Sequence, residues 1–287
     1  VQCNVYSLNK PLRKKYTMGW LGDKFITNLE KYNFIKDLDK KCTFEWRQGV
    51  KHDCSKVMIL YELAKNTYKN NMGEKWKLET ELLYPFLKSS DLQQFAYDGT
   101  TNRRILITQK RLGMETNYIQ TNYPKTWKYL QNHKKLLAKR KSKIYQNQPP
   151  FSLFGIGAYA FSPYKVAIAS MYKEAQFILL TQMEQKPIML DDTCYYLSFE
   201  NYSTALFTNS ILNTPIVKEF LSAITSHRKQ RVYTKSILSR IGLEALIQKI
   251  SYQDIKNIWT KEKFKPKLNN PEKAYEIFRQ KILNKEH

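Results

Sequence analysis

The sequence predicts an α+β fold, and three observations support that prediction. Residues 151–199 contain short runs of β-branched and aromatic residues separated by turn-forming residues, a pattern that is typical of strands. After Pro215 the apolar residues recur at three- and four-residue spacing, which is the period of an amphipathic helix. Apolar residues make up 42% of the 287 residues, enough to bury a core in one large or two small domains.

The first half of the chain is mixed in character. Up to about Asp53 aromatic residues lie among basic and turn-forming ones, and Ser55 is placed to cap a short helix with an apolar face from Val57 to Ala64. Residues 65–77 are hydrophilic and contain Asn and Gly, so they predict an exposed loop. Residues 104–109 are β-branched and apolar, which predicts a buried strand.

The second half begins with a helix and is then rich in strands. Pro124 opens a helix with apolar residues as far as Leu137, followed by a basic stretch that ends at Pro149-Pro150. At these prolines we place a seam between an N-terminal part (1–148) and a C-terminal part (149–287), which can both belong to one domain. The strands expected after the seam are 166–169, 177–180, 188–190 and 195–199, and the helices expected after them cover 216–224, 237–250 and the residues from Pro271.

The charge of the chain is strongly positive. The 48 Lys and Arg residues minus the 25 Asp and Glu residues give +23, and a polyanion would relieve the resulting self-repulsion. Nucleic acid is therefore the expected partner, with an anionic membrane surface as the second choice. Aromatic residues, which stack on bases, are also abundant, with 20 Tyr, 14 Phe and 5 Trp.

The sequence argues against a membrane-spanning or secreted protein. The longest apolar run, Phe177–Leu180, is far shorter than the roughly 18–20 residues of a membrane span. No signal-peptide pattern opens the chain, and its four cysteines are scattered without a Cys-x-x-Cys pair. We therefore expect reduced thiols in a cytoplasmic protein with no membrane partner. Because the first residue is not Met, we expect a fragment or a processed chain.

Motifs for catalysis are mostly missing. The sequence has no Gly-x-x-x-x-Gly-Lys loop, no Gly-x-Gly-x-x-Gly and no Gly-x-Ser-x-Gly elbow. Phe154-Gly155-Ile156-Gly157 predicts a tight turn, and His52-Asp53-Cys54 predicts the start of a helix with a buried thiol rather than a metal site. Asp191-Asp192 leaves open a metal-dependent nuclease.

Several segments, in this order, resemble a known family. Residues 46–58 are similar to the W-R-x-G-(I/V)-K-H-D-C-x-x-V-M stretch that follows the catalytic domain in a group of adenine-specific DNA methyltransferases. Residues 81–92 resemble the L-x-P-x-L-K-x-x-D-(I/L) element of TaqI-type C-terminal specificity domains. Residues 140–145, 151–167 and 187–195 resemble later landmarks of the same group, so the similarity extends from about Trp46 to Arg240.

The resemblance implies a TaqI-type target-recognition region that lacks its own methyl-transfer site. In that family the catalytic half carries a glycine-rich S-adenosylmethionine loop and an Asn-Pro-Pro-aromatic motif, and neither is in this sequence. Gln148-Pro149-Pro150-Phe151 has Gln where the Asn is needed, and Asn270-Pro271-Glu272 lacks the second proline and the aromatic residue. The resemblance therefore implies no cofactor in this chain, S-adenosylmethionine in the parent enzyme, and a catalytic domain on the same polypeptide or a partner chain.

The predicted function is sequence-specific binding of double-stranded DNA within a restriction–modification system. Lys and Arg neutralise phosphates, whereas amide, carboxylate and aromatic side chains read bases or wedge between them. The expected phosphate or base contacts are Arg47, Lys51, Arg140, Lys141, Lys165 and Lys173, and the candidate base readers or wedges are Gln48, Tyr159, Tyr164 and Asp191. The alternatives are a metal-dependent DNA endonuclease that uses Asp191 or Asp192, and a protein that binds RNA or single strands without sequence preference.

Overall fold

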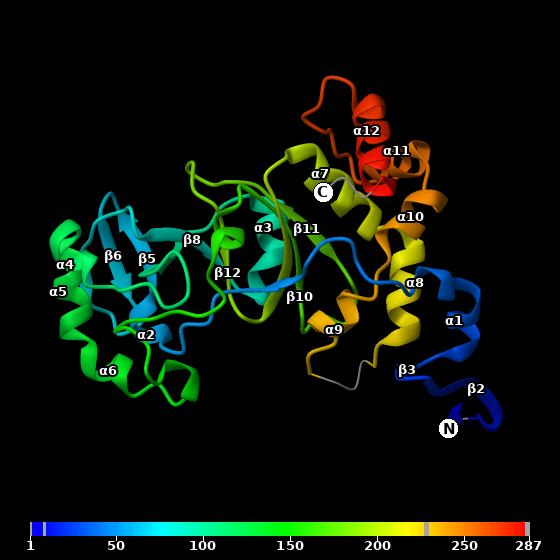
Figure 1. Cartoon of the computed structure of the whole chain (residues 1–287), viewed down its shortest axis with the longest axis horizontal. Helices are drawn as coiled ribbons and strands as arrows, with labels where there is room; N and C mark the ends of the chain where they lie inside the picture. The colour runs from blue at the N-terminus through cyan, green and yellow to red at the C-terminus, as the bar shows by residue number, and fades with distance from the viewer. Residues whose placement is uncertain (1, 8–9, 227–229, 285–287) are drawn as a thin grey trace. The chain divides into compact units, whose positions relative to one another are not determined.

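The computed structural model describes residues 2–7, 10–226 and 230–284 (Figure 1). The chain divides into two compact units, each assembled from separated stretches of sequence. Unit 1 comprises residues 1–46, 166–179 and 201–287, and unit 2 comprises residues 47–165 and 180–200. Pro149-Pro150, where the sequence suggests a seam, lies inside unit 2. The combination of helices and sheets confirms the predicted α+β class.

Unit 1 begins with an antiparallel sheet of order β1-β2-β3, followed by a helix that Asn28 caps. The Asn28 side chain accepts a hydrogen bond of 3.0 Å from the backbone N–H of Lys31 and so satisfies a free donor of the first turn. These elements are β1 (Gln2–Ser7), β2 (Lys10–Leu21), β3 (Lys24–Ile26), α1 (Leu29–Ile35) and the 3₁₀ helix η1 (Lys36–Leu38).

The C-terminal part of unit 1 is helical, as the sequence predicts. Pro215 and Pro271 each lie in the first turn of a helix, where the missing proline N–H has no intrahelical acceptor to lose. Its helices are α7 (Tyr202–Leu212), α8 (Pro215–Ile224), α9 (Lys235–Leu238), α10 (Leu243–Lys249), α11 (Tyr252–Lys261) and α12 (Pro271–Leu283). Most residues of the strands β10 (Tyr164–Ala169) and β11 (Phe177–Leu180) also belong to unit 1.

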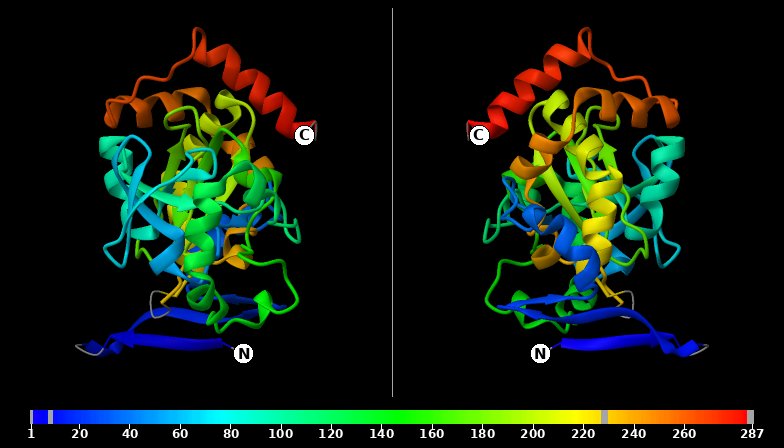
Figure 2. Two further views of the ribbon diagram at one scale, coloured as in Figure 1. Left: turned by 90° about the vertical axis from the view of Figure 1, so that its left-hand side faces the viewer. Right: turned by 90° about the vertical axis from the view of Figure 1, so that its right-hand side faces the viewer.

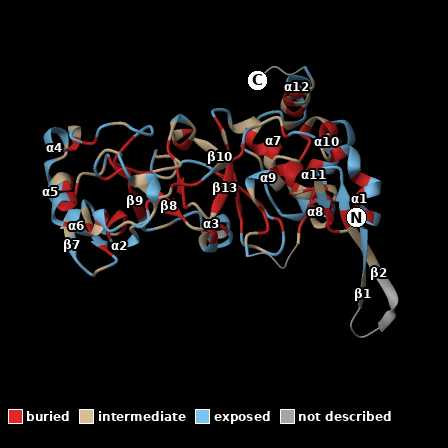
Figure 3. Cartoon of the chain, turned by 60° about the horizontal axis from the view of Figure 1, so that its bottom comes forward, coloured by how far each residue is buried: buried red, intermediate tan, exposed pale blue. Residues whose placement is uncertain are grey.

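The core of this helical part surrounds α7, which is largely buried (Figure 3). Phe207 of α7 packs against Trp259 of α11 and against Tyr275 and Phe278 of α12, with ring centroids 6.0, 5.3 and 5.6 Å away. Both views of Figure 2 show α11 and α12 beside α7. The stretch 237–250, expected as a single stripe, is divided into α9 and α10 because the backbone N–H of Gly242 turns away to the carbonyl of Leu38, 2.9 Å away.

A buried carboxylate ties the N-terminal segment of unit 1 to the helices after α8. The side chain of Asp39 is only 1% exposed and accepts hydrogen bonds from Lys24 Nζ (2.9 Å), Tyr32 Oη (2.8 Å) and Arg240 Nη2 (2.7 Å). Burial alone would raise the pKa of Asp39, but these three donors outweigh it and hold the pKa below its ordinary value.

Asp39→Asn is expected to lower the free energy of unfolding at pH 7 by about 2–3 kcal/mol, because it leaves Arg240 without its counter-charge. Since the folded pKa lies below the unfolded one, the stabilisation by Asp39 is present above the unfolded pKa and is lost as the pH falls through the folded value. Urea unfolding at pH 7 and in acid measures both effects. Asp37→Asn, whose partner Lys249 is 45% exposed, is the matched control and is expected to cost less than about 1 kcal/mol. Equal losses for the two variants would contradict the prediction.

Unit 2 is built on a sheet of order β12-β8-β9-β5-β6-β7, in which β12 pairs parallel to β8 and the other neighbours pair antiparallel. A second, antiparallel pair joins β4 and β13. The strands at 103–106, 189–190 and 194–199 confirm the runs that the sequence predicts as strands in this unit. The bounds are β4 (Arg47–Gln48), β5 (Ile59–Ala64), β6 (Thr67–Asn70), β7 (Lys75–Lys77), β8 (Leu83–Leu87), β9 (Arg103–Leu106), β12 (Met189–Leu190) and β13 (Cys194–Phe199).

Short helices connect and cover these strands. They are α2 (Ser55–Met58), α3 (Leu92–Asp98), α4 (Tyr118–Asn122), α5 (Pro124–Asn132), α6 (Lys134–Ala138) and the 3₁₀ turns η2 (Ser89–Asp91), η3 (Lys143–Tyr145) and η4 (Ala158–Phe161). The predicted helix from Pro124 is confirmed but interrupted at His133, whose ring nitrogens lie 2.7 Å from the Tyr129 carbonyl oxygen and 2.8 Å from the Glu74 carboxylate.

Two expectations for unit 2 are wrong. Residues 65–77 do not form a loop but contain the paired strands β6 and β7. The sequence here is almost entirely polar, yet Tyr68 and Asn70 are buried, with exposed fractions of 2% and 1%. The helix that begins at Ser55 ends at Met58, and the next residues form β5, in which Ile59 is the register partner of Ile105. Within the described ranges no helix is long and apolar enough to cross a membrane.

Candidate nucleic-acid interface

Three segments that are far apart in the sequence meet at Gly49 in unit 2. The backbone N–H groups of Gly49 and Val50 donate to the carbonyls of Cys194 (3.0 Å) and Leu190 (2.6 Å). Lys51 and Phe154 exchange two backbone hydrogen bonds of 2.9 and 3.0 Å. We call this meeting of residues 47–51, 154–155 and 190–194 the Gly49 junction; it joins three of the segments on which the family resemblance rests.

Glycine is required at the junction because the backbones approach one another closely. A Cβ on Gly49 would lie 2.1 Å from the carbonyl oxygen of Asp191, and a Cβ on Gly155 would lie 2.4 Å from that of Gly49. Gly155 also has a φ of +67°, which side chains with a Cβ rarely adopt. The tight turn that Phe154-Gly155-Ile156-Gly157 predicts is thus a point of contact with residues 48 and 49.

A polar and aromatic surface borders the junction. The guanidinium carbon of Arg47 lies 4.5 Å from the ring centroid of Tyr159, a cation–π contact between two half-buried side chains. Gln48 is exposed, and its Nε2 donates to the carbonyl of Asp192 at 2.7 Å. The side chain of Lys51 is 37% exposed, with Nζ 3.6 Å from Asp53 Oδ2. Arg47, Gln48, Lys51 and Tyr159 therefore keep solvent-facing atoms within one neighbourhood, as a binding surface requires.

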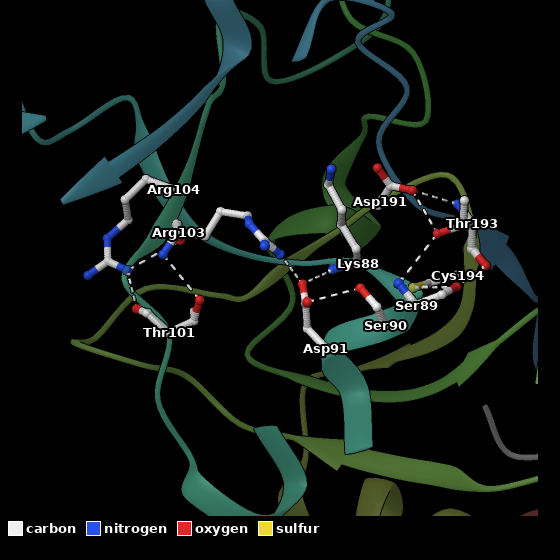
Figure 4. Close-up of polar contacts among 10 residues, drawn as sticks. All are labelled: Lys88, Ser89, Ser90, Asp91, Thr101, Arg103, Arg104, Asp191, Thr193 and Cys194. Atoms are coloured by element: carbon white, nitrogen blue, oxygen red, sulfur yellow. Dashed lines mark hydrogen bonds and ion pairs between the residues drawn. The ribbon is translucent and has the colours of Figure 1, made fainter. Parts of the chain in front are cut away.

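A fourth segment of the resemblance, around η2, is held to the junction by hydrogen bonds (Figure 4). The Oγ of Ser89 donates to the carbonyl of Thr193 at 2.7 Å. Beside it, Asp91 accepts from the backbone N–H of Lys88 at 2.7 Å and forms an ion pair with Arg103. The sequence analysis did not single out Asp91 or Arg103, because nothing local links a turn at 89–91 to a strand at 103.

Asp191, a predicted base reader, is turned to a structural task. Its Oδ1 accepts from the backbone N–H (3.0 Å) and the Oγ1 (2.7 Å) of Thr193, and the residue is only 9% exposed (Figure 4). No group of three or more His, Cys, Asp or Glu residues in the described ranges could hold a metal ion. This carboxylate closes a turn, as Asp residues commonly do.

The prediction that Lys165 contacts a phosphate or a base is wrong. The residue is 2% exposed, and its Nζ donates to the carbonyl of Ser162 at 3.0 Å and lies 5.8 Å from the ring centroid of Tyr196. A phosphate cannot reach an ammonium group in that position. Burial lowers the pKa of Lys165 to about 7. Of the remaining predicted contacts, Tyr164 is half-buried, and Lys173 is exposed but belongs to unit 1.

The last two predicted contacts lie in residues 139–152, which we call the Arg140 loop. Arg140 is half-buried, with its guanidinium carbon 3.7 Å from the ring centroid of Tyr145, whereas Lys141 is exposed. Lys139, which the sequence analysis did not single out, is also exposed. Its position two residues from Lys141 is the feature of the sequence that could have identified it as a further phosphate contact.

The motif His52-Asp53-Cys54 lies at the start of a helix, as predicted, but the Cys54 thiol is half-buried and not buried. The Nδ1 of His52 accepts from the backbone N–H of Cys54 at 3.1 Å, just before α2 begins. Burial raises the pKa of the half-buried Cys54 thiol, which disfavours a reactive thiolate.

Comparisons with known proteins relate the chain to part of a Type II methyltransferase. No family model matches the chain. The chain is 40% identical over 249 residues to the Type II methyltransferase M.NspV of Nostoc sp., in an alignment that covers 86% of this chain and 51% of that protein. A solved structure of the Type IIL restriction-modification enzyme MmeI in complex with DNA matches 86% of this chain and 34% of its own, but its TM-score of 0.40 and 8% identity are too low to argue from. The chain therefore spans about half the length of the curated relative that it matches and is homologous to that part of a Type II methyltransferase.

Proposed function

We propose that this chain binds duplex DNA sequence-specifically as the target-recognition portion of an adenine DNA methyltransferase, with a TaqI-type specificity fold. In this proposal a catalytic domain on the same polypeptide or a partner chain supplies S-adenosylmethionine and transfers the methyl group. The observation that carries the proposal is the Gly49 junction, which assembles a solvent-facing set of cationic, amide and aromatic side chains in a relative of a Type II methyltransferase.

Each of the four side chains that border the junction has a chemical role that suits a double helix. Arg47 and Lys51 carry charges that neutralise phosphates and release counterions. The Gln48 amide both donates and accepts, which matches the edge of an adenine in the major groove. Tyr159, held beside Arg47, offers a ring face that can stack on or wedge between bases.

A binding competition tests the proposal directly. A random duplex library selected on the purified chain should yield one short motif, bound about 10³-fold or more tighter than unrelated duplex. Single-stranded DNA and RNA of the same length should compete no better than unrelated duplex. Equal affinity for single strands would favour the sequence-independent binder, and magnesium-dependent cleavage of plasmid DNA would favour the nuclease.

Lys141→Ala and Gln48→Ala are expected to weaken binding in different ways. Loss of one phosphate contact at Lys141 should weaken all duplexes alike and flatten the slope of log K against log salt by about one unit. Loss of the Gln48 amide should relax specificity at one base pair, at a cost of about 1–3 kcal/mol, and leave the slope unchanged. Titrations at several salt concentrations measure both effects. Lys69→Ala, an exposed lysine of β6, is the charge-matched control, and the same slope change there would show that only net charge matters.

A further inference from the structure

We infer that Arg140 is a positioning residue: its guanidinium bonds to backbone carbonyls of unit 2 and fixes the Arg140 loop so that Lys139 and Lys141 are presented to backbone phosphates. This inference rests on the proposed DNA-binding function. It reassigns Arg140, because Nε and Nη1 of the guanidinium, which charge alone marks as a phosphate contact, donate to the protein's own carbonyls, and the group lies against a Tyr ring.

The contacts of Arg140 tie together three parts of unit 2. Its Nε donates to the carbonyl of Leu137 (3.0 Å) at the end of α6, and its Nη1 donates to the carbonyl of Ser152 (2.6 Å) at the end of the loop. A longer contact of 3.4 Å reaches the carbonyl of His52. One side chain therefore holds both ends of the loop and the segment that leaves the Gly49 junction.

Tyr145 adds a second set of contacts to those of Arg140, and we call the two side chains together the lock. Its ring lies against the guanidinium, and its hydroxyl donates to the carbonyl of Lys51 at 3.1 Å. The same ring packs edge-on against Phe154, with centroids 5.3 Å apart. Lys51 and Phe154 are hydrogen-bonded to each other in the junction, so the lock connects the Arg140 loop to the Gly49 junction.

Arginine is the side chain that suits this task. The planar guanidinium places several N–H donors in fixed directions and stacks on an aromatic face, whereas a lysine ammonium does neither. Burial lowers the pKa of Arg140 below its ordinary value, yet the guanidinium is so weak an acid that it stays charged. Among the described residues no carboxylate forms an ion pair with Arg140, and its charge is stabilised by carbonyl dipoles, the Tyr145 ring and the more distant charge of Asp53.

The lock leaves two hollows beside the same residues. One, of about 400 Å³, is lined by Lys134, Lys141, Tyr145 and Gln148 among others. The other, of about 620 Å³, is lined by Asp53, Lys139, Arg140, Lys141 and Ser142. The first hollow is lined by no carboxylate, and in the second the cationic side chains outnumber the single carboxylate of Asp53, so each hollow suits an anion. Duplex phosphates are the anions that the proposed function supplies.

The test uses Arg140→Lys in the 287-residue chain, because this change keeps the charge and removes the lock. Amide hydrogen exchange across residues 139–148 should become about tenfold faster or more, and the slope of log K against log salt should fall by about two units as both lysines lose their placement. Lys141→Ala is the control: its slope should fall by about one unit with exchange unchanged. Should Arg140→Lys not fold, Tyr145→Leu removes the other half of the lock and carries the same expectations.

The outcomes separate this inference from the function on which it rests. Unchanged exchange and an unchanged slope in Arg140→Lys would overturn the positioning role. The slope of log K against log salt could also stay unchanged in Arg140→Lys but fall by one unit in Arg140→Ala. That result would make Arg140 a direct phosphate contact and would also overturn the positioning role. If Arg140→Lys speeds exchange while the wild-type chain binds no duplex, the lock stands and the proposed function is rejected.

Discussion

Gly49→Ala is expected to destabilise unit 2 by about 4 kcal/mol or more and to abolish specific duplex binding. The new Cβ would lie 2.1 Å from the carbonyl oxygen of Asp191 and 2.4 Å from that of Leu190. Both atoms belong to the backbone, so no change of rotamer relieves the overlap. Moving the strand away would break the 2.6 Å hydrogen bond from Val50 to Leu190 and release the side chains of Arg47, Gln48 and Lys51 from their common neighbourhood.

Urea unfolding followed by circular dichroism measures the loss, with duplex binding as the second measurement. Gly113→Ala is the matched control in the same unit, because Gly113 has a φ of +74° but no atom within 4 Å of the place that a methyl group would take. Strain alone should cost the control about 1 kcal/mol. A Gly49→Ala protein as stable as Gly113→Ala, or one that still selects the same DNA motif, would show that the junction tolerates a side chain.

The sequence predicts the elements of this fold well wherever local pattern and tertiary role agree. Phe177–Leu180 is a short apolar run between turn-formers and forms the strand β11 with the same bounds. The helices that start at Pro215 and Pro271 begin where proline favours a first turn. The hairpin of β6 and β7 was missed because burial of Asn70 depends on Glu74, whose carboxylate accepts from its amide at 2.8 Å. A polar residue that finds its partner only in the folded chain carries no apolar signal in the sequence.

The candidate site was predictable in its segments but not in the direction of its side chains. Residue type marks Lys141 and Lys165 equally as phosphate contacts, yet the first is exposed and the second is 2% exposed. The difference is set by the strand on which Lys165 lies, because β10 is buried on both faces from Lys165 to Ala169. The requirement for glycine at position 49 was also hidden, because the colliding carbonyl belongs to residue 191.

Lys165→Met is expected to stabilise the protein at pH 7 by about 3–4 kcal/mol, an unusual direction for a substitution in a core. The Lys165 ammonium gives up water for one carbonyl, and burial lowers its pKa from 10.5 to about 7. Between these two values the unfolded chain holds a proton that the folded chain has released, so wild-type stability rises with pH across this window. Methionine has no proton to lose and fills a similar volume.

The pH dependence distinguishes this explanation from better packing. The advantage of Lys165→Met in urea unfolding should reach its plateau below pH 7, be close to that plateau at pH 7, and shrink to about 1 kcal/mol near pH 10, where the unfolded chain also loses most of its proton. Lys173→Met, at an exposed lysine, should show the wild-type dependence on pH. A constant advantage across pH would mean that packing, not desolvation, is responsible.

Because a buried ammonium cannot touch phosphate, Lys165→Met should also leave the slope of log K against log salt for duplex binding unchanged. A slope lower by one unit would show that Lys165 becomes exposed when DNA binds.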